Sequence, residues 1–331
     1  MKKTLSIIAG SLVGSLLLWL ALRHIDFGRL AAAYAGMRKI YLLPSALLVV
    51  AELFLRGARW RLLLRPSSPS ARVADAFRLE TAGLALNNIL PLRLGELARA
   101  TFGARVFGAP LVTVLATILV ERLLDVVVLF LLFALAARLG GLTGGMLAYG
   151  GALWTLAAGA AAGIAALIFS DELVAHAWFS GFFRRFPRFR ALFERVAMGV
   201  KGFHSLRSGA LIIGFAAAQW IVDALNMYLL GLAFGLGAAI DLFKGMALIF
   251  AGAAAASMPG MPGYFGNYEL VLTRVLGAWG VPADAGFAYV FCAHVTGYLI
   301  VTLLGLFFIY RMGHSLEKVW AEFSAVRKER A

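Results

Sequence analysis

Long apolar runs constrain the fold of this chain more than any other feature of its sequence. Four clear examples cover residues 5–22, 42–55, 111–137 and 299–309. Runs of this kind approach the ~20 residues that a helix needs to cross a bilayer. Inside a bilayer the backbone must satisfy its own hydrogen bonds, so only helices or a closed barrel can span it. The runs lack the two-residue alternation of barrel strands, so the sequence predicts membrane-spanning helices.

The composition supports an all-α integral membrane protein. Of the 331 residues, 62% are hydrophobic and 15% are charged, whereas a soluble domain is about half apolar and about a quarter charged. The net charge of +14 comes from cations between the apolar runs, which is typical of the positive-inside rule and not of nucleic-acid binding. Cys292 is the single cysteine, so neither a disulfide framework nor a cysteine-based metal site is expected.

The predicted topology has six spanning helices and two helical pairs interrupted by proline and glycine. The six helices are expected at about 4–22, 41–64, 111–137, 146–169, 209–235 and 285–310. The two broken pairs are expected at about 73–90 with 92–107 and 242–257 with 264–279. Each pair starts and ends on one side of the membrane, and its two arms either cross fully or turn within the membrane. This arrangement predicts a single transmembrane domain over residues 1–331.

Charge predicts the orientation. Residues 171–207 mix arginines with phenylalanines, as in an amphipathic loop on the anionic cytoplasmic leaflet. The basic tail 312–331 is also expected in the cytoplasm, and the segment 25–40 falls outside in mild violation of the rule. We therefore expect a multi-pass protein of the bacterial inner (plasma) membrane with both termini cytoplasmic.

The order of elements divides into two halves with the same plan and opposite topology. The first inverted repeat would cover residues 1–140 and the second residues 141–311. Inverted repeats with interrupted helices are a recurring plan of transporters. Polar spacing agrees, because three polar residues spaced i, i+4, i+7 precede each broken pair on one helical face. They are Glu52, Arg56 and Arg59 in the first half and Gln219, Asp223 and Asn226 in the second.

Acidic residues inside the predicted helices define a candidate site. A charge at the bilayer centre costs about 3 kcal/mol even on the lenient insertion scale, so acids beside arginines predict a polar interior that serves a substrate or a proton path. Structural ion pairing is the alternative for part of this set. The candidate substrate-binding residues are Arg56, Arg59, Asn88, Arg93, Glu96, Arg99, Glu121, Arg122, Asp125, Asp223, Asn226 and Glu269. No catalytic residue, cofactor or metal ligand is predicted.

The broken pairs suggest which chemistry this interior would bind. A break exposes backbone N–H groups at the start of the second arm, and these groups favour anions. Arg93 and Arg99 would strengthen that preference, since guanidinium matches a phosphate bidentately. A phosphate-bearing lipid headgroup is therefore the expected partner. Glu96 and Glu269 begin the same arms and could bind an amine or exchange protons, and the sequence leaves both readings open.

At this point four motifs resemble a known family, the lysylphosphatidylglycerol synthase transmembrane region, also described as flippase-like domain proteins. The motifs are Arg56-x-x-Arg59-Trp60, Asn88-x-x-Pro91-x-Arg93-x-Gly95-Glu96-x-x-Arg99, Glu121-Arg122-x-x-Asp125 and Pro259-Gly260-x-x-Gly263-x-x-Gly266-x-x-Glu269. The resemblance covers nearly the whole chain and implies a membrane protein that moves lipids between leaflets. Larger members also carry a soluble aminoacyl-transferase domain that makes the lipid, and this sequence has no such segment up to Ala331.

Three hypotheses follow. The leading one is a lipid flippase or transporter in which a phosphate-bearing headgroup passes through a polar cavity between the two broken pairs. The second is a membrane-embedded enzyme or enzyme subunit that modifies a headgroup, although no zinc, aspartyl-protease or nucleophile-elbow motif is present. The third is a scaffold with structural ion pairs. A homo-oligomer stays open.

Overall fold

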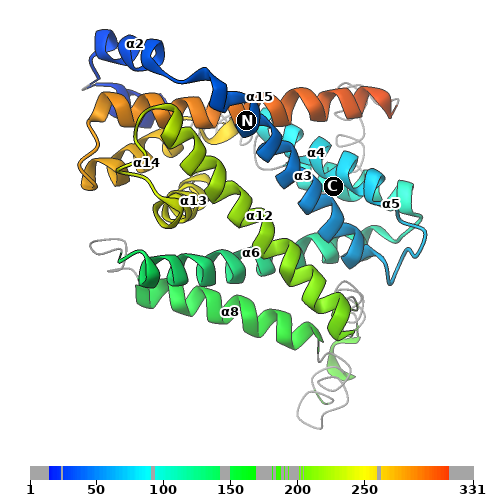
Figure 1. Cartoon of the computed structure of the whole chain (residues 1–331). Coiled ribbons are helices and arrows are strands. Elements are labelled where there is room, and N and C mark those ends of the chain that lie inside the picture. The colour runs from blue at the N-terminus through cyan, green and yellow to red at the C-terminus, as the bar shows by residue number, and fades with distance from the viewer. Residues whose placement is uncertain are drawn as a thin grey trace.

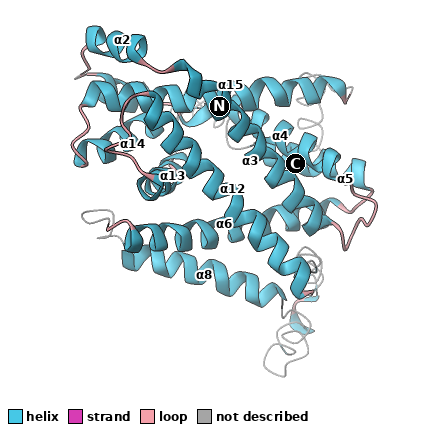
Figure 2. Ribbon diagram, in the orientation of Figure 1, coloured by secondary structure: helices cyan, strands magenta, loops and turns pink. Residues whose placement is uncertain are grey.

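The structure is a computed structural model that describes residues 15–23, 25–90, 94–141, 150–168, 181, 184–187, 190, 193, 201, 203, 205–258 and 262–312. Within these residues the regular elements are helices, and no strand occurs (Figure 2). The longer helices are α2 (Phe27–Gly36), α3 (Leu42–Leu64), α4 (Val73–Ile89), α5 (Leu94–Phe107), α6 (Leu111–Leu139), α8 (Gly150–Ile168), α12 (Leu206–Ala233), α13 (Leu242–Ser257), α14 (Asn267–Ala278) and α15 (Ala283–Arg311). Two 3-10 turns, η1 (Lys39–Tyr41) and η4 (Pro262–Tyr264), precede α3 and α14. The predicted all-α membrane fold is confirmed.

Three of the described helical segments are long and apolar enough to cross a membrane. They are η1 with α3 (Lys39–Leu64), α12 and α15. Helix α6 equals α15 in length, at 29 residues, but it carries Glu121, Arg122 and Asp125 near its middle. Glu121 and Asp125 are buried against other helices, and Arg122 is partly exposed, as described below. The chain is thus a multi-pass membrane protein, while the number of spans and the inverted repeat remain predictions.

The two predicted broken pairs are both helix–loop–helix hairpins. Helices α4 and α5 pack against each other, as do α13 and α14. In the first hairpin Gly95 lies so close to the backbone of Gly83 and Asn87 that a side chain there would collide with both. In the second, η4 and the two residues after it reverse the chain, with left-handed φ angles of 73° at Gly263, 64° at Tyr264 and 90° at Gly266. Glycine adopts such angles readily, but tyrosine does so at a cost.

Helices from distant parts of the chain form the centre of the molecule. Helices α3 and α12 lie side by side across the middle of Figure 1, with α15 above them, below α2, and with α6 and α8 beneath them. Helix α15 packs closely on α4, where Gly305 has no space for a Cβ next to Ala85 and Thr81. Hydrogen bonds at two levels along their length show that α3 and α12 run antiparallel. Ser45 meets Asn226 near one end, while Arg59 and Gln219 both reach Asp125 nearer the other.

The segment after the first predicted helix, expected on the external side, contains a helix that was not predicted from the sequence. It contains α2, whose first turn is capped by Asp26, with the carboxylate accepting from the N–H groups of Gly28 and Arg29 at 2.8 and 3.2 Å. Leu30 of α2 packs with Ile25 against a small apolar cluster on α15. An N-cap and a short apolar contact are sufficient to hold this ten-residue helix.

Some predicted features fall outside the described residues. These are the first part of the helix at 4–22, of which residues 15–22 are helical, Arg93, most of the basic loop 171–207, and the tail from residue 313 onward. Their predicted roles stay predictions.

Candidate functional site

A buried ionic network joins helices α3, α4, α5 and α6. Its members are Arg59, Glu80, Arg99, Glu121 and Asp125. Glu121 accepts from both arginines, at 2.7 Å from Arg59 Nη2 and 2.6 Å from Arg99 Nη2. Arg59 Nη1 also lies 2.6 Å from Asp125 Oδ1, and Arg99 Nη1 lies 2.5 Å from Glu80 Oε2. Arg59, Glu80 and Glu121 are fully buried.

Neighbouring side chains close the network from two directions. On one side, Gln219 of α12 donates to Asp125 Oδ1 at 3.1 Å, and the guanidinium of Arg99 lies 3.8 Å from the centre of the Trp60 ring. On the other, Arg122 pairs with Glu96 at 3.3 Å and with Asp125 at 3.4 Å, and both Arg122 and Glu96 are about 30% exposed. The charges of the ionic network are therefore directed at one another, which accounts for their presence inside a membrane protein.

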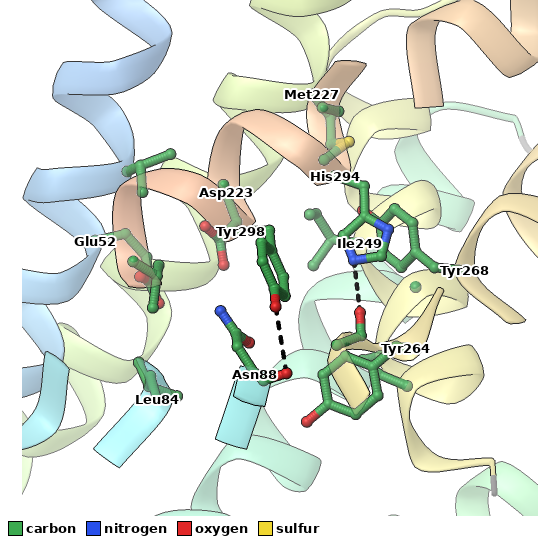
Figure 3. Close-up of a pocket in the computed structure, with 18 of the residues that line it drawn as sticks. Glu52, Leu84, Asn88, Asp223, Met227, Ile249, Tyr264, Tyr268, His294 and Tyr298 are labelled. Carbon is green, nitrogen blue, oxygen red and sulfur yellow. Dashed lines mark hydrogen bonds between the residues drawn. The ribbon is translucent and has the colours of Figure 1, made fainter. Parts of the chain in front are cut away.

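A separate cavity of about 310 Å³ lies between α3, α4, α12, the α13–α14 hairpin and α15 (Figure 3). Both predicted halves of the chain contribute to it. The three helices that could span a membrane each provide side chains from near their middle: Glu52 is the eleventh of the 23 residues of α3, Asp223 the eighteenth of the 28 of α12, and His294 the twelfth of the 29 of α15. If these helices cross the bilayer, the cavity lies well inside it.

Charged groups of the cavity lie on the side formed by α3 and α12. Glu52 and Arg56 are one turn apart on α3 and form an ion pair. The guanidinium of Arg56 also lies 5.6 Å from the centre of the Trp220 ring, in cation–π geometry. Asp223 points into the cavity (Figure 3) and accepts no hydrogen bond from any described residue. The cavity thus offers one half-buried carboxylate without a hydrogen-bond donor beside an existing ion pair.

Aromatic and amide side chains form the opposite side. Tyr264 of η4, Tyr268 of α14 and Tyr298 of α15 line the cavity, together with Asn88 near the end of α4. Asn88 Nδ2 donates to the hydroxyl of Thr302 at 2.9 Å, so α4 is fixed to α15 at this point. Tyrosines combine a flat apolar face with a hydroxyl, which suits a headgroup that is polar at one end.

Glu269 and His294 connect the second hairpin to α15 at the edge of the cavity. Glu269 Oε2 accepts from the backbone N–H of Gly266 at 2.7 Å and so caps its own helix. Its other oxygen lies 2.5 Å from His294 Nδ1, and the second ring nitrogen of His294 lies 2.8 Å from the carbonyl oxygen of Gly263. The backbone N–H group of Gly266, at the expected anion site before α14, therefore donates to Glu269.

The predicted site residues separate into distinct groups. Arg56, Asn88 and Asp223 line the cavity. Six others belong to the ionic network or its edge: Arg59, Glu96, Arg99, Glu121, Arg122 and Asp125. Asn226 instead accepts from Ser45 at 2.7 Å between α3 and α12, and Glu269 contacts the cavity wall through His294.

The prediction missed several residues of these two places. Glu80 pairs with Arg99, and its only sequence signal was an acid within an apolar stretch of α4. His294 and Tyr298 line the cavity, and their i, i+4 spacing was the available signal. Glu52 also lines it, and it shares one predicted helical face with Arg56 but is not among the predicted binding residues. Tyr264 and Tyr268 adjoin the second break and carried no signal apart from that position. Among the described residues, no group of three His, Cys, Asp or Glu side chains is arranged to hold a metal ion.

Comparison with known proteins places the chain in a family. The model of the family described as "Lysylphosphatidylglycerol synthase TM region" matches residues 7–305. A "UPF0104 membrane protein" of Methanothermobacter thermautotrophicus is 25% identical over 297 residues, which cover 82% of this chain and 85% of that protein. No solved structure matches. Since the family match extends over most of the sequence, the chain belongs to the family of the lysylphosphatidylglycerol synthase transmembrane region.

Proposed function

We propose that this protein moves a membrane lipid with a phosphate-bearing headgroup between the two leaflets, by way of the cavity between α3, α12, α15 and the two hairpins. The observation that carries the proposal is the Asp223 carboxylate, held without a hydrogen-bond donor in a cavity of about 310 Å³ beside the ion pair of Glu52 and Arg56. A carboxylate without a hydrogen-bond donor inside a membrane protein is costly unless a ligand or water completes it.

The cavity has the size to hold a headgroup but not a whole lipid. A volume of about 310 Å³ lies at the lower end of small-molecule sites. The acyl chains would remain outside in the bilayer, against the exposed apolar side chains that α3 and α15 carry on their outer faces. These include Leu43, Leu47 and Phe54 on α3 and Leu299, Leu303 and Phe307 on α15.

The charged residues suggest how a headgroup would lie. Arg56 would contact the phosphate, because its guanidinium can donate two parallel hydrogen bonds to phosphate oxygens. Glu52 and Trp220 orient that guanidinium. Asp223 would accept hydrogen bonds from hydroxyl or ammonium groups at the far end of the headgroup, while the tyrosines cover its apolar surface.

The test is lipid translocation in proteoliposomes. The vesicles would contain phosphatidylglycerol and phosphatidylethanolamine with a trace of phosphatidylglycerol labelled on one acyl chain with a nitrobenzoxadiazole dye, whose outer-leaflet fraction dithionite bleaches. A hydrogen bond to a charged group contributes about 1.5–3 kcal/mol, so Asp223→Asn should slow translocation about tenfold or more. The matched control is Asp75→Asn, since Asp75 forms only exposed ion pairs with Arg72 and Arg78. Equal rates for wild type and both variants would contradict the proposal.

The same vesicles distinguish the second hypothesis of a lipid-modifying enzyme. Glu269 and His294 form a carboxylate–imidazole pair beside the cavity, and such a pair can act as general acid and base. Mass spectrometry of the extracted lipids would then show a headgroup of altered mass that is absent from Glu269→Gln vesicles. A transporter leaves every lipid mass unchanged.

A further inference from the structure

We propose that Glu269 and His294 form a proton-binding site that couples lipid movement to proton movement across the membrane. This inference rests on the proposed function and adds its coupling ion. The two residues are called the proton pair below. Glu269 is on α14 of the second hairpin, and His294 is near the middle of α15.

The hydrogen bonds around His294 require the pair to hold a proton in addition to the one that a neutral imidazole carries. Gly263 O is a carbonyl oxygen and can only accept, so His294 Nε2, at 2.8 Å, must donate to it. The contact of 2.5 Å between Nδ1 and Glu269 Oε1 also needs a proton between the two atoms. That proton resides on His294 as imidazolium beside a carboxylate, or on Glu269 as carboxylic acid beside a neutral ring. In both cases the pair holds two protons in total and has a net charge of zero.

Loss of the shared proton would break one of these contacts. A neutral imidazole has one N–H group, so it can donate to Glu269 or to Gly263 but not to both. If the proton remains on Nε2, the lone pair of Nδ1 faces a negative carboxylate. If it moves to Nδ1, the carbonyl of Gly263 loses its donor.

The turn at Gly263 and Tyr264, which would respond to loss of the proton, is part of the cavity wall. Gly263 and Tyr264 line the cavity, and Tyr264 adopts a φ of 64° that is unfavourable for a residue with a side chain. The contact from His294 to Gly263 is one of the bonds that hold this turn in place. Proton binding would therefore fix the turn against α15, and proton release would free it to move.

Aromatic side chains surround His294 beside Glu269. The ring of Phe265 stacks on His294 at 4.4 Å, and the ring of Tyr268 lies 4.6 Å from it. The phenol of Tyr268 belongs to the same side chain that contacts His294, and the phenols of Tyr264 and Tyr298 line the same cavity. Across the cavity the charged groups are Asp223 on α12 and the ion pair of Glu52 and Arg56 on α3; α4 and α13 contribute none to the cavity wall.

The cavity also provides the route for the proton. The His294 side chain is 10% exposed and lines the cavity, whereas that of Glu269 is fully buried behind it. A proton would enter from the cavity onto the imidazole. Any lipid headgroup in the cavity would lie between the pair and Asp223, so occupancy by lipid and by proton would be linked.

The experiment uses the full-length protein in proteoliposomes of phosphatidylglycerol and phosphatidylethanolamine that contain the dye-labelled phosphatidylglycerol outside and the pH indicator pyranine inside. An imposed pH gradient should accelerate dye translocation at least about fivefold, the lower range of a typical coupling between two sites. A pyranine signal should accompany it. Glu269→Gln and His294→Gln should translocate the dye at a rate that the gradient does not change. The matched control is Glu96→Gln, which removes a carboxylate from the same position of the other hairpin and should retain the response.

The outcomes separate this inference from the function on which it rests. If wild-type protein translocates the dye at a rate that the gradient does not alter, without a pyranine signal, the proton pair is not a coupling site, although lipid movement stands. If the dye does not move at all, the proposed function fails for this lipid. The pair is then judged by ¹⁵N NMR of the histidine rings in detergent, with His294 assigned from His294→Gln.

The NMR measurement tests the proton pair whether or not the dye is translocated. A proton-binding pair predicts that both ring nitrogens of His294 carry hydrogen, or share one with Glu269, at the acid end of a pH series, and that a single proton is lost as the pH is raised. The amide signal of Tyr264 should change in the same step, and neither change should occur in Glu269→Gln. A His294 ring that keeps one protonation state throughout, or that titrates while Tyr264 stays constant, overturns the proposal.

Discussion

The two hairpins place a glutamate at the same position and give it different partners. Glu96 is the third residue of α5, and Glu269 is the third residue of α14. Glu96 pairs with Arg122, whose guanidinium remains charged at every physiological pH. Glu269 pairs with His294, whose imidazole can carry one proton or two. The first hairpin is thus attached to a permanent ionic structure and the second to a contact that depends on one proton.

The surroundings of each glutamate extend this difference. Next to α5 the ionic network fills the interior and leaves its arginines and acids paired with one another. Next to α14 lies the cavity, with an unpartnered carboxylate at Asp223. Under the proposed function, buried charge in one region of the protein stabilises the arrangement of helices, whereas in the other it binds a ligand. Four substitutions test this distinction, from the largest expected effect on stability to the smallest.

The largest loss of stability is expected for Glu121→Gln. Glu121 accepts from Arg59 and Arg99 and is fully buried. Neutralising it leaves two guanidinium groups without their shared anion, and breaking a buried pair costs about 3–5 kcal/mol. The thermal midpoint is measured by heating samples in detergent and recording, by size-exclusion chromatography, how much folded protein remains at each temperature. A midpoint equal to that of wild type would show that the network does not stabilise the fold.

A smaller loss is expected for Glu269→Ala. The substitution removes the cap on Gly266 and the partner of His294, and a buried donor left without its acceptor costs about 1–3 kcal/mol. The thermal midpoint should lie between those of wild type and Glu121→Gln. Glu269→Gln keeps an oxygen for the Gly266 N–H group and should recover most of the loss. If the glutamine variant is as unstable as the alanine variant, the charge and not the hydrogen bond maintains the turn.

A still smaller loss is expected for Glu96→Gln. Glu96 and Arg122 are both about 30% exposed, and Arg122 keeps its second contact with Asp125. Partly exposed ion pairs contribute less than about 1 kcal/mol. The thermal midpoint should therefore remain close to that of wild type, as measured in the same heated-sample assay. A loss of stability as large as that of Glu121→Gln would show that the stabilising ionic network includes Glu96 at the hairpin break.

No measurable loss is expected for Asp223→Asn, because the carboxylate accepts no hydrogen bond from a described residue. Replacing it with a neutral amide of the same shape removes the cost of holding that charge inside the protein, so the thermal midpoint should equal or exceed that of wild type. Normal stability together with slow lipid translocation would mark Asp223 as a ligand-binding residue. A clear loss of stability would instead place it among the structural charges.

The helices and hairpins could be predicted from the sequence because apolar runs and proline–glycine interruptions are local signals. The range predicted as 41–64 is helix α3 at Leu42–Leu64, and the break after residue 257 coincides with the end of α13 at Ser257. The division between ionic network and cavity could not be predicted. Arg56 and Arg59 lie on one helical face, yet one lines the cavity and the other is enclosed by Glu121 and Asp125. Which acid reaches which arginine depends on packing between helices far apart in the sequence.

The binding of a lipid headgroup in the cavity is tested most directly by native mass spectrometry of the gently purified protein, with identification of the lipids that remain bound. Wild type should retain a phosphate-bearing lipid class in excess of its share of the membrane. Asp223→Asn should lose that enrichment while Asp75→Asn and Glu96→Gln keep it. If wild type and Asp223→Asn carry the same bulk lipids, the cavity is not a headgroup site and the proposed lipid translocation through it is contradicted.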